Sequence, residues 1–131
     1  MAEIKLTDSM AQLLKGDRFA GKTLLLVTDD GGGKYSLQGG ACSIGANFTV
    51  IILDQPDPDY SVPLKNDAGI PLYTSNYDLT FLGHGLTMDY QHYTISLKDD
   101  SGLLDGGMRI AKGTDVLAAF KQGITVSGAT C

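Results

Sequence analysis

The chain has no tryptophan, only two cysteines and two histidines, and no cluster of basic residues. Its 10 Lys and Arg residues are scattered among 15 Asp and Glu residues, so the formal net charge is −5. Binding to a nucleic acid or to an anionic membrane surface requires clustered positive charge, so neither partner is expected. The sequence also lacks an apolar run long enough for a signal peptide or a transmembrane helix. These absences predict a cytoplasmic protein whose cysteines remain thiols.

Length and apolar content predict one folded domain over residues 1–131. The chain has 131 residues, of which 43% are hydrophobic, enough to build a core. Strands are expected at 24–27, 48–53, 70–74, 87–98 and 108–110, because these runs are apolar, β-branched or alternating. Helices are expected at 7–15, at 115–122 after a Thr114 cap, and as one turn at 76–81. The pattern indicates a mostly β, α+β domain with a helix at each end.

The most unusual stretch is the glycine-rich segment 29–45, DDGGGKYSLQGGACSIG, which contains Cys42. Dense glycine indicates a backbone that turns through positive φ or approaches another group closely. A thiol in such a loop can bind metal, take part in redox chemistry or simply pack, and free cysteines are often fully buried. The residues alone leave both a structural and a functional Cys42 open. Cys131 is the last residue, where chains commonly fray.

Two common ligand-binding motifs are incomplete in this chain. GGGK followed by Tyr35 resembles a phosphate loop, but Thr28 occupies the position of the first required glycine. A glycine-rich hairpin between two strands is the better interpretation. The aspartates at 54, 57 and 59 and those at 99, 100 and 105 lack the closing glutamate of a calcium loop. They are interpreted as solvated turn carboxylates.

The histidines have no sequence neighbours that would make them metal ligands or bases. His84 lies between two glycines in a turn, and His92 lies on the polar face of the strand expected at 87–98. Neither has a histidine four residues away, and no Cys-x-x-Cys is present. A Cys42–His nucleophile pair remains open, but nothing in the sequence brings the two residues together. Without a complete catalytic constellation, the chain is not expected to be an enzyme.

Three segments resemble the HesB-like family, the A-type iron–sulfur cluster assembly proteins. IKLTDSMAQLLKG resembles the family's opening strand and capped helix, and LLLVTDDGGGKYS with GGACS resembles its strand and glycine loop. FLGHGLTMDY resembles its glycine turn before a Thr-x-x-Asp-Tyr strand. The resemblance covers most of residues 1–110 and leaves 111–131 as a C-terminal extension. It implies a HesB-like fold of mixed short sheets, with an N-terminal helix and an added C-terminal helix.

The chain departs from the family pattern in its cysteines. Cluster carriers of the family use one cysteine in the glycine loop and a Cys-Gly-Cys near the C-terminus. Here the corresponding SGLLDGGMRI contains no cysteine. An alignment on GGG places the loop cysteine at Lys34, whereas an alignment on Cys-Ser places it at Cys42. The resemblance is closest to a divergent lactobacillus-type branch with a single loop cysteine.

The resemblance implies a protein of iron–sulfur assembly that binds iron or a cluster. Because clusters are usually held by four thiolates, Cys42 would act across a homodimer, with Cys131, His84 or an aspartate completing the ligands. Fe–S assembly or recipient proteins would be its partners. Two alternatives remain: an interaction module that kept the fold without a cluster, and a thiol redox protein.

Overall fold

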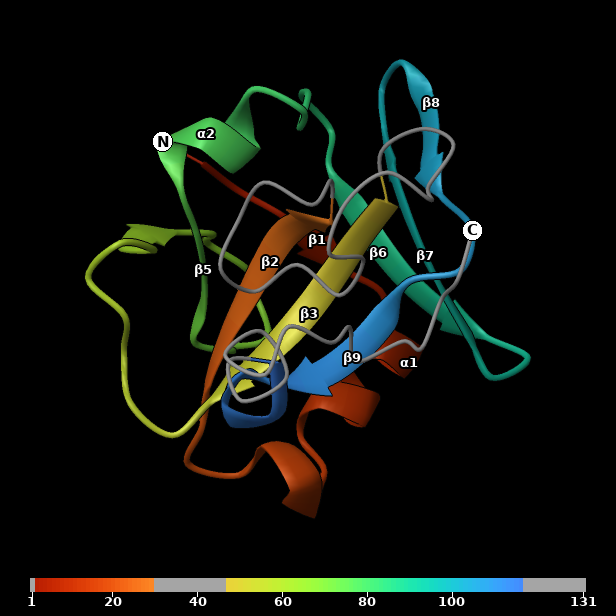
Figure 1. Cartoon of the computed structure of the whole chain (residues 1–131). Helices are drawn as coiled ribbons and strands as arrows, with labels where there is room; N and C mark the ends of the chain where they lie inside the picture. The colour runs from red at the N-terminus through yellow and green to blue at the C-terminus, as the bar shows by residue number, and fades with distance from the viewer. Residues whose placement is uncertain (1, 30–46, 117–131) are drawn as a thin grey trace, which may run out of the picture.

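The computed structural model describes residues 2–29 and 47–116, which form two small β-sheets, three short helical elements and a helical stretch that begins at residue 113 (Figure 1). The strands are β1 Lys5–Leu6, β2 Thr23–Asp29, β3 Asn47–Leu53, β4 Val62–Pro63, β5 Leu72–Thr74, β6 Thr87–Gln91, β7 Thr94–Asp99, β8 Gly102–Asp105 and β9 Arg109–Lys112. The helical elements are α1 Asp8–Leu14, the 3₁₀ helix Asp17–Phe19 and α2 Asn76–Leu79. This mostly β, mixed-sheet architecture confirms the expected fold class.

The larger sheet has the strand order β4-β5-β2-β3-β9. Its centre is the antiparallel pair β2 and β3, in register from Thr23↔Leu53 to Asp29↔Asn47. These are the unbroken apolar runs of the sequence, and buried central strands have that composition. β5 and β9 join β2 and β3 as parallel neighbours. The glycine-rich segment therefore connects two adjacent antiparallel strands, as its hairpin interpretation predicted.

The smaller sheet has the order β1-β6-β7-β8 and corrects one expectation. The single strand predicted at 87–98 is a hairpin, because the chain reverses at His92 and Tyr93, whose φ angles are 52° and 63°. Inward positions change from even numbers at Met88 to odd numbers at Ile95 and Leu97. A two-residue turn shifts the alternation by only one position, and the sequence analysis did not recognise this shift as a reversal.

Two other segments expected to be irregular contain short strands. β4 lies in the proline-rich stretch that ends at Pro63, and β8 lies in the turn-rich stretch before β9. Both strands are at sheet edges, where proline and short length are tolerated. The last helix was expected from Asp115 with Thr114 as its cap, but helical structure begins at residue 113. The remainder of that predicted helix lies outside the described residues.

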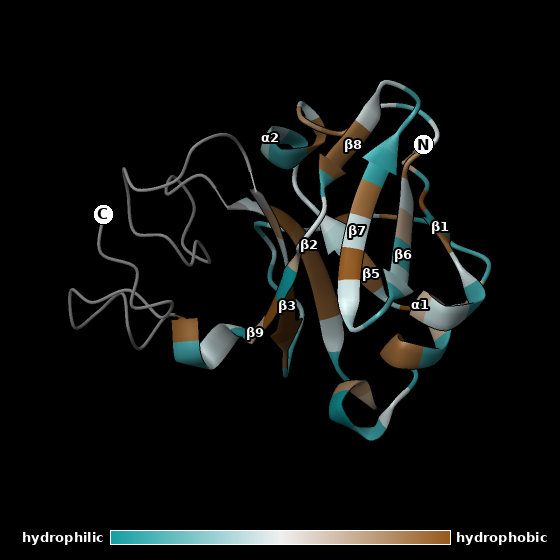
Figure 2. Ribbon diagram, turned by 90° about the vertical axis from the view of Figure 1, so that its right-hand side faces the viewer, coloured by the Kyte–Doolittle hydropathy of each residue, from teal (hydrophilic) through white to brown (hydrophobic). Residues whose placement is uncertain are grey.

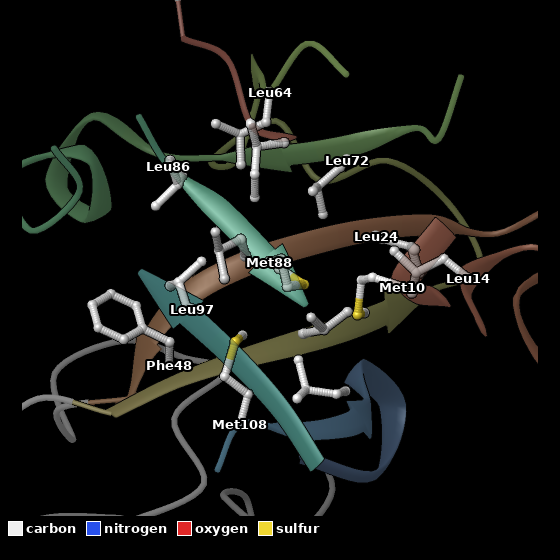
Figure 3. Close-up of a cluster of buried hydrophobic side chains, with 14 of the residues drawn as sticks. Met10, Leu14, Leu24, Phe48, Leu64, Leu72, Leu86, Met88, Leu97 and Met108 are labelled. Carbon is white, nitrogen blue, oxygen red and sulfur yellow. The ribbon is translucent and has the colours of Figure 1, made fainter. Parts of the chain in front are cut away.

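The main core fills the space between the two sheets and α1 (Figure 3). Hydrophobic stretches of the strands, brown in Figure 2, supply most of it. α1 begins where the sequence predicted, because Thr7 Oγ1 accepts a hydrogen bond from Met10 N at 3.4 Å. The same hydroxyl donates to Asp89 Oδ1 at 2.6 Å, which ties the helix start to β6. A second cluster lies on the other face of the larger sheet: Leu25, Val27, Ile51, Leu53 and Val116.

Candidate functional site

The predicted ligand Cys42 belongs to segment 30–46, which connects β2 to β3 and lies outside the described residues, as does Lys34. Cys131 lies outside them too. Their roles therefore stay predictions, and what the structure describes is the base of the segment. That base is the end of the β2–β3 ladder, where Thr28 is directly opposite Phe48 and Asp29 opposite Asn47.

Two aspartates from distant parts of the chain bind the base of this segment. Asp78 Oδ1 in α2 accepts a hydrogen bond from Thr28 N at 2.9 Å. Asp105 Oδ2 in β8 accepts one from Phe48 N at 2.8 Å. In Figure 1, α2 and β8 stand on either side of this end of the larger sheet. The only local signal for Asp78 was the helix-capping pattern Ser75-x-x-Asp78, and Asp105 was assigned to a turn.

Two buried hydroxyls at this end of the sheet have no hydrogen-bond partner among the residues that the structure describes. They are Thr28 Oγ1 and Thr49 Oγ1, in residues that are 4% and 1% exposed. Thr28 shares the main-core face with Leu26, whereas Thr49 shares the opposite face with Ile51. Because they lie on opposite faces of the sheet, the two hydroxyls do not form one binding site.

His84 is exposed, and its backbone is held against the turn between β7 and β8. Asp100 N donates to His84 O at 2.8 Å, and Gly83 N donates to Asp99 Oδ2 at 2.9 Å. A Cβ atom at Gly83 or Gly85 would come within 2.5 or 2.1 Å of these aspartate side chains. The two glycines therefore allow close approach of the chain segments. They keep His84 at a defined place beside a hollow of about 380 Å³.

The described residues do not assemble a metal site around His84. Within residues 2–29 and 47–116, no group of three or more His, Cys, Asp or Glu side chains is placed to hold a metal ion. The hollow beside His84 is lined mainly by apolar side chains, among them Leu79, Leu82 and Leu86. His92 is exposed at the tip of the β6–β7 hairpin, which corrects its expected place on the face of a strand.

The acidic clusters have local structural partners. Lys22 Nζ lies 2.5 Å from Asp54 Oδ1, and this hydrogen bond lowers the pKa of the Asp54 carboxyl. Asp99 is only 8% exposed, so the expectation that it is a solvated turn carboxylate is wrong. It accepts hydrogen bonds from Ser101 Oγ at 2.5 Å and Ser101 N at 2.8 Å. The bond from the hydroxyl is the main cause that lowers the pKa of Asp99.

A second hollow of the described surface lies away from the ends of β2 and β3. It has a volume of about 960 Å³ and opens between β1 and the turn at Asn66–Pro71. Its lining carries both signs of charge, for example Lys5 and Lys65 with Glu3 and Asp67. Because both signs are present, the lining does not favour a ligand of either charge.

The comparisons with known proteins identify the family. A family model for iron-sulphur cluster biosynthesis matches residues 2–112. The crystal structure of a candidate Fe-S biosynthesis protein from Lactobacillus acidophilus has a TM-score of 0.78 and is 42% identical, covering 92% of this chain and 98% of that one. A second candidate Fe-S biosynthesis protein, from Lactobacillus salivarius, shares the fold, with a TM-score of 0.65 at 24% identity over 84% of this chain and 97% of that one. No curated protein matches the sequence.

No helix among the described residues is long and apolar enough to cross a membrane. The family match spans the strand and glycine segment from which the resemblance was inferred, and it ends at the last residue of β9. It includes Cys42 and His84 but not Cys131. The HesB-like resemblance seen in the sequence is thereby confirmed, and the chain belongs to the iron-sulphur cluster biosynthesis family.

Proposed function

We propose that this protein takes part in iron–sulfur cluster assembly by holding iron or a cluster as cargo on Cys42, shared between two copies of the chain. The observation that supports this proposal is the family match over residues 2–112, which includes the segment between β2 and β3 that contains Cys42. Asp78 and Asp105 hold Thr28 and Phe48, the strand residues on either side of that segment.

Counting ligands supports a shared site. One chain has two cysteines, whereas clusters are usually held by four thiolates. Two chains supply two copies each of Cys42 and Cys131, which together make four. Because Cys131 lies beyond the family match, His84 is the alternative second ligand. His84 is exposed and its backbone is fixed, so its ring is accessible to iron that Cys42 of another chain would carry.

A second candidate function is an interaction module that keeps the fold and carries no cluster. It is favoured by the absence of cysteine from SGLLDGGMRI, the counterpart of the family's Cys-Gly-Cys. In this chain Asp105 of that stretch instead bonds to Phe48 N. The described region between β7 and β9 thus has a structural role that needs no metal.

We propose that the protein carries iron or a cluster and does not catalyse a reaction. Among the described residues, the aspartates whose pKa is lowered are Asp54, Asp89 and Asp99, and each shift is explained by a neighbouring hydrogen-bond donor. They come from three separate places in the fold and do not converge on one pocket. Catalytic groups with perturbed pKa values are usually gathered in one cleft.

Anaerobic reconstitution with ferrous iron and sulfide tests the proposal. After desalting, the protein should be coloured, with iron and acid-labile sulfide bound at a fixed ratio per pair of chains. Cys42→Ser should abolish the colour, whereas Cys131→Ser and His84→Ala should show which residue is the second ligand. A colourless product from the unsubstituted chain would refute cluster binding. Colour that survives Cys42→Ser would show that the cargo is held elsewhere.

The oligomeric state separates the two candidate functions. Size-exclusion chromatography with light scattering should show a larger dimer fraction after reconstitution than before it, because the cluster would join two chains. Removal of iron with a chelator should reverse the change. A clusterless interaction module would have the same mass in both conditions.

A further inference from the structure

β1 is joined to β6 by the backbone groups of its odd-numbered residues. Lys5 N donates to Leu86 O at 2.8 Å, and Thr7 N donates to Met88 O at 3.1 Å. Successive residues of a strand direct their N–H and C=O groups to opposite sides of the strand. The backbone groups of the even-numbered residues therefore point away from β6, toward the chain that follows β4.

On that side, only the beginning of the strand has a partner. Ile4 N donates to Lys65 O at 2.8 Å, and Lys65 N donates to Ala2 O at 3.1 Å, which together form the isolated bridge at Glu3. Within residues 2–29 and 47–116, neither Ile4 O nor Leu6 N has a backbone partner. The edge of the strand from Ile4 O to Leu6 N is therefore open.

The chain after Lys65 does not continue the pairing, because it is held in a turn. Asn66 Nδ2 donates to Leu64 O at 3.1 Å and to Ile70 O at 3.0 Å. Asn66 Oδ1 also accepts from Ile70 N at 3.0 Å. With three hydrogen bonds from one side chain, the turn has a fixed shape, so the gap between it and β1 is preformed.

This gap is the hollow of about 960 Å³, and its base is apolar. The uncharged side chains that line it include Ile4, Leu6, Leu64, Ile70 and Leu72. Leu64 and Leu72, both labelled in Figure 3, are 2% exposed and belong to the main core. The hollow thus combines an apolar base with a wall that is an open strand edge.

The charged side chains of the lining have no charged partners. Five exposed side chains of both signs line the hollow: Glu3, Lys5, Asp8, Lys65 and Asp67. Within the described part of the chain, none of the five forms an ion pair. An unpaired mixture of both signs suits a peptide with several side chains better than a small ion of one charge.

We propose that this hollow is a docking groove for an extended segment of a partner protein, which adds a strand beside β1. An N–H group of the segment donates to Ile4 O and one of its C=O groups accepts from Leu6 N, as in strand addition at other sheet edges. Its side chains alternate, so apolar ones lie over Leu64 and Leu72 and charged ones lie beside the exposed Lys5. The proposal goes beyond iron carriage and does not depend on it.

Amide exchange of the iron-free protein, measured by NMR, tests the open edge before any ligand is added. The N–H of Leu6 should exchange at least about tenfold faster than those of Lys5 and Thr7, which are bonded to β6. Equal protection at the three positions would show that the edge is already paired and would overturn the proposal.

A library of displayed random heptapeptides is the probe for binding, because recognition through the backbone accepts many sequences. Selection on the full chain should enrich peptides in which apolar and charged residues alternate. A synthetic copy of an enriched peptide should slow exchange at Leu6 by at least about tenfold. Absence of enrichment, or a bound peptide that leaves exchange at Leu6 unchanged, would overturn the proposal.

Leu6→Pro and Leu6→Ala form a matched pair of variants. Leu6→Pro removes the N–H that faces the hollow and none of the listed bonds to β6, whereas Leu6→Ala keeps the N–H and shortens the side chain. Affinity for the peptide should fall about tenfold or more in Leu6→Pro and less than about threefold in Leu6→Ala. Equal affinity in the two variants would show that the backbone of β1 is not used.

Single N-methyl groups along the peptide test the same bonds on the unaltered protein, so the result stands even if Leu6→Pro does not fold. Methylation should weaken binding only at alternate residues, because every second N–H of an added strand faces β1. An equal effect at every residue would contradict strand addition.

Light scattering of the iron-free chain distinguishes a partner protein from a second copy of the chain. The iron-free parent should show no dimer that depends on this edge. A dimer that Leu6→Pro dissociates and Leu6→Ala keeps would show that a second copy occupies the hollow, and would overturn the assignment to a separate partner. None of these measurements uses iron, so their failure is distinct from failure of cluster reconstitution.

Discussion

Val116 offers a direct test of whether the chain beyond the family match is part of the fold. The match ends at residue 112, yet Val116 is 1% exposed and packs in the cluster on the outer face of the larger sheet. Its neighbours there include Leu25 and Ile51, both completely buried. We therefore expect Val116→Ala to lower the free energy of unfolding substantially.

The size of the effect follows from the atoms removed. Val116→Ala deletes two buried carbons, at about 0.8 kcal/mol each. Leu25 and Ile51 belong to the central paired strands β2 and β3, which limits how far they can move to fill the space. The cavity adds a further cost for that reason. The total loss should be about 2 kcal/mol.

Urea unfolding followed by circular dichroism measures this loss. With a slope of about 2 kcal/mol/M, typical of a small domain, the midpoint should fall by about 1 M at unchanged slope. Asp115→Ala is the matched control, because Asp115 is the preceding residue and is exposed. Its effect should stay within about 0.5 kcal/mol. Equal midpoints for the two variants would refute the structural role of Val116.

Three further predictions concern local structure. Thr7→Ala removes the α1 cap and the hydrogen bond to Asp89, so it should lower the free energy of unfolding in urea by about 1 kcal/mol. Thr7→Ser keeps the hydroxyl and should retain most of the stability. An equal loss in both variants would contradict the role of the cap. Replacement of His92-Tyr93 by Asn-Gly should raise stability by about 1 kcal/mol or more, because both positions have positive φ; a lower melting temperature would contradict it. Ser101→Ala removes the main cause that lowers the pKa of Asp99. A carboxyl whose folded pKa is depressed stabilises the fold above its unfolded pKa, about 3.9, and loses this contribution as pH falls through the folded pKa. The stability gap between parent and Ser101→Ala should thus be full at about pH 7 and should narrow as the pH falls below about 4. A gap that does not change with pH would contradict the assignment.

Elements with strong local signals were predicted well. The apolar runs at 24–27 and 48–53 lie within β2 and β3, and α1 lies within the helix expected at 7–15. Their prediction succeeded because buried strands and helix caps depend on residues close together in the sequence. The hairpin at His92-Tyr93 was missed because its turn lacks the Asn-Gly or Asp-Gly usual for positive φ.

Electrostatic roles were predicted less well than secondary structure. Asp99 was interpreted as a solvated turn residue, but it is buried and accepts hydrogen bonds from Gly83 and Ser101. Composition shows that an aspartate follows a strand, but not which N–H groups another segment brings to it. The environment of such a carboxylate is therefore visible only in the folded chain.

The sequence by itself determined the family, the mostly β architecture and the choice of Cys42 as candidate ligand. These depend on residue order, apolar periodicity and the scarcity of cysteine, all of which are properties of the linear chain. Only the tertiary structure decided that α2 and β8 bring Asp78 and Asp105 to the two strand ends beside the Cys42 segment. Those contacts join residues about fifty positions apart, and such proximity arises from sheet order and packing, which no local pattern encodes.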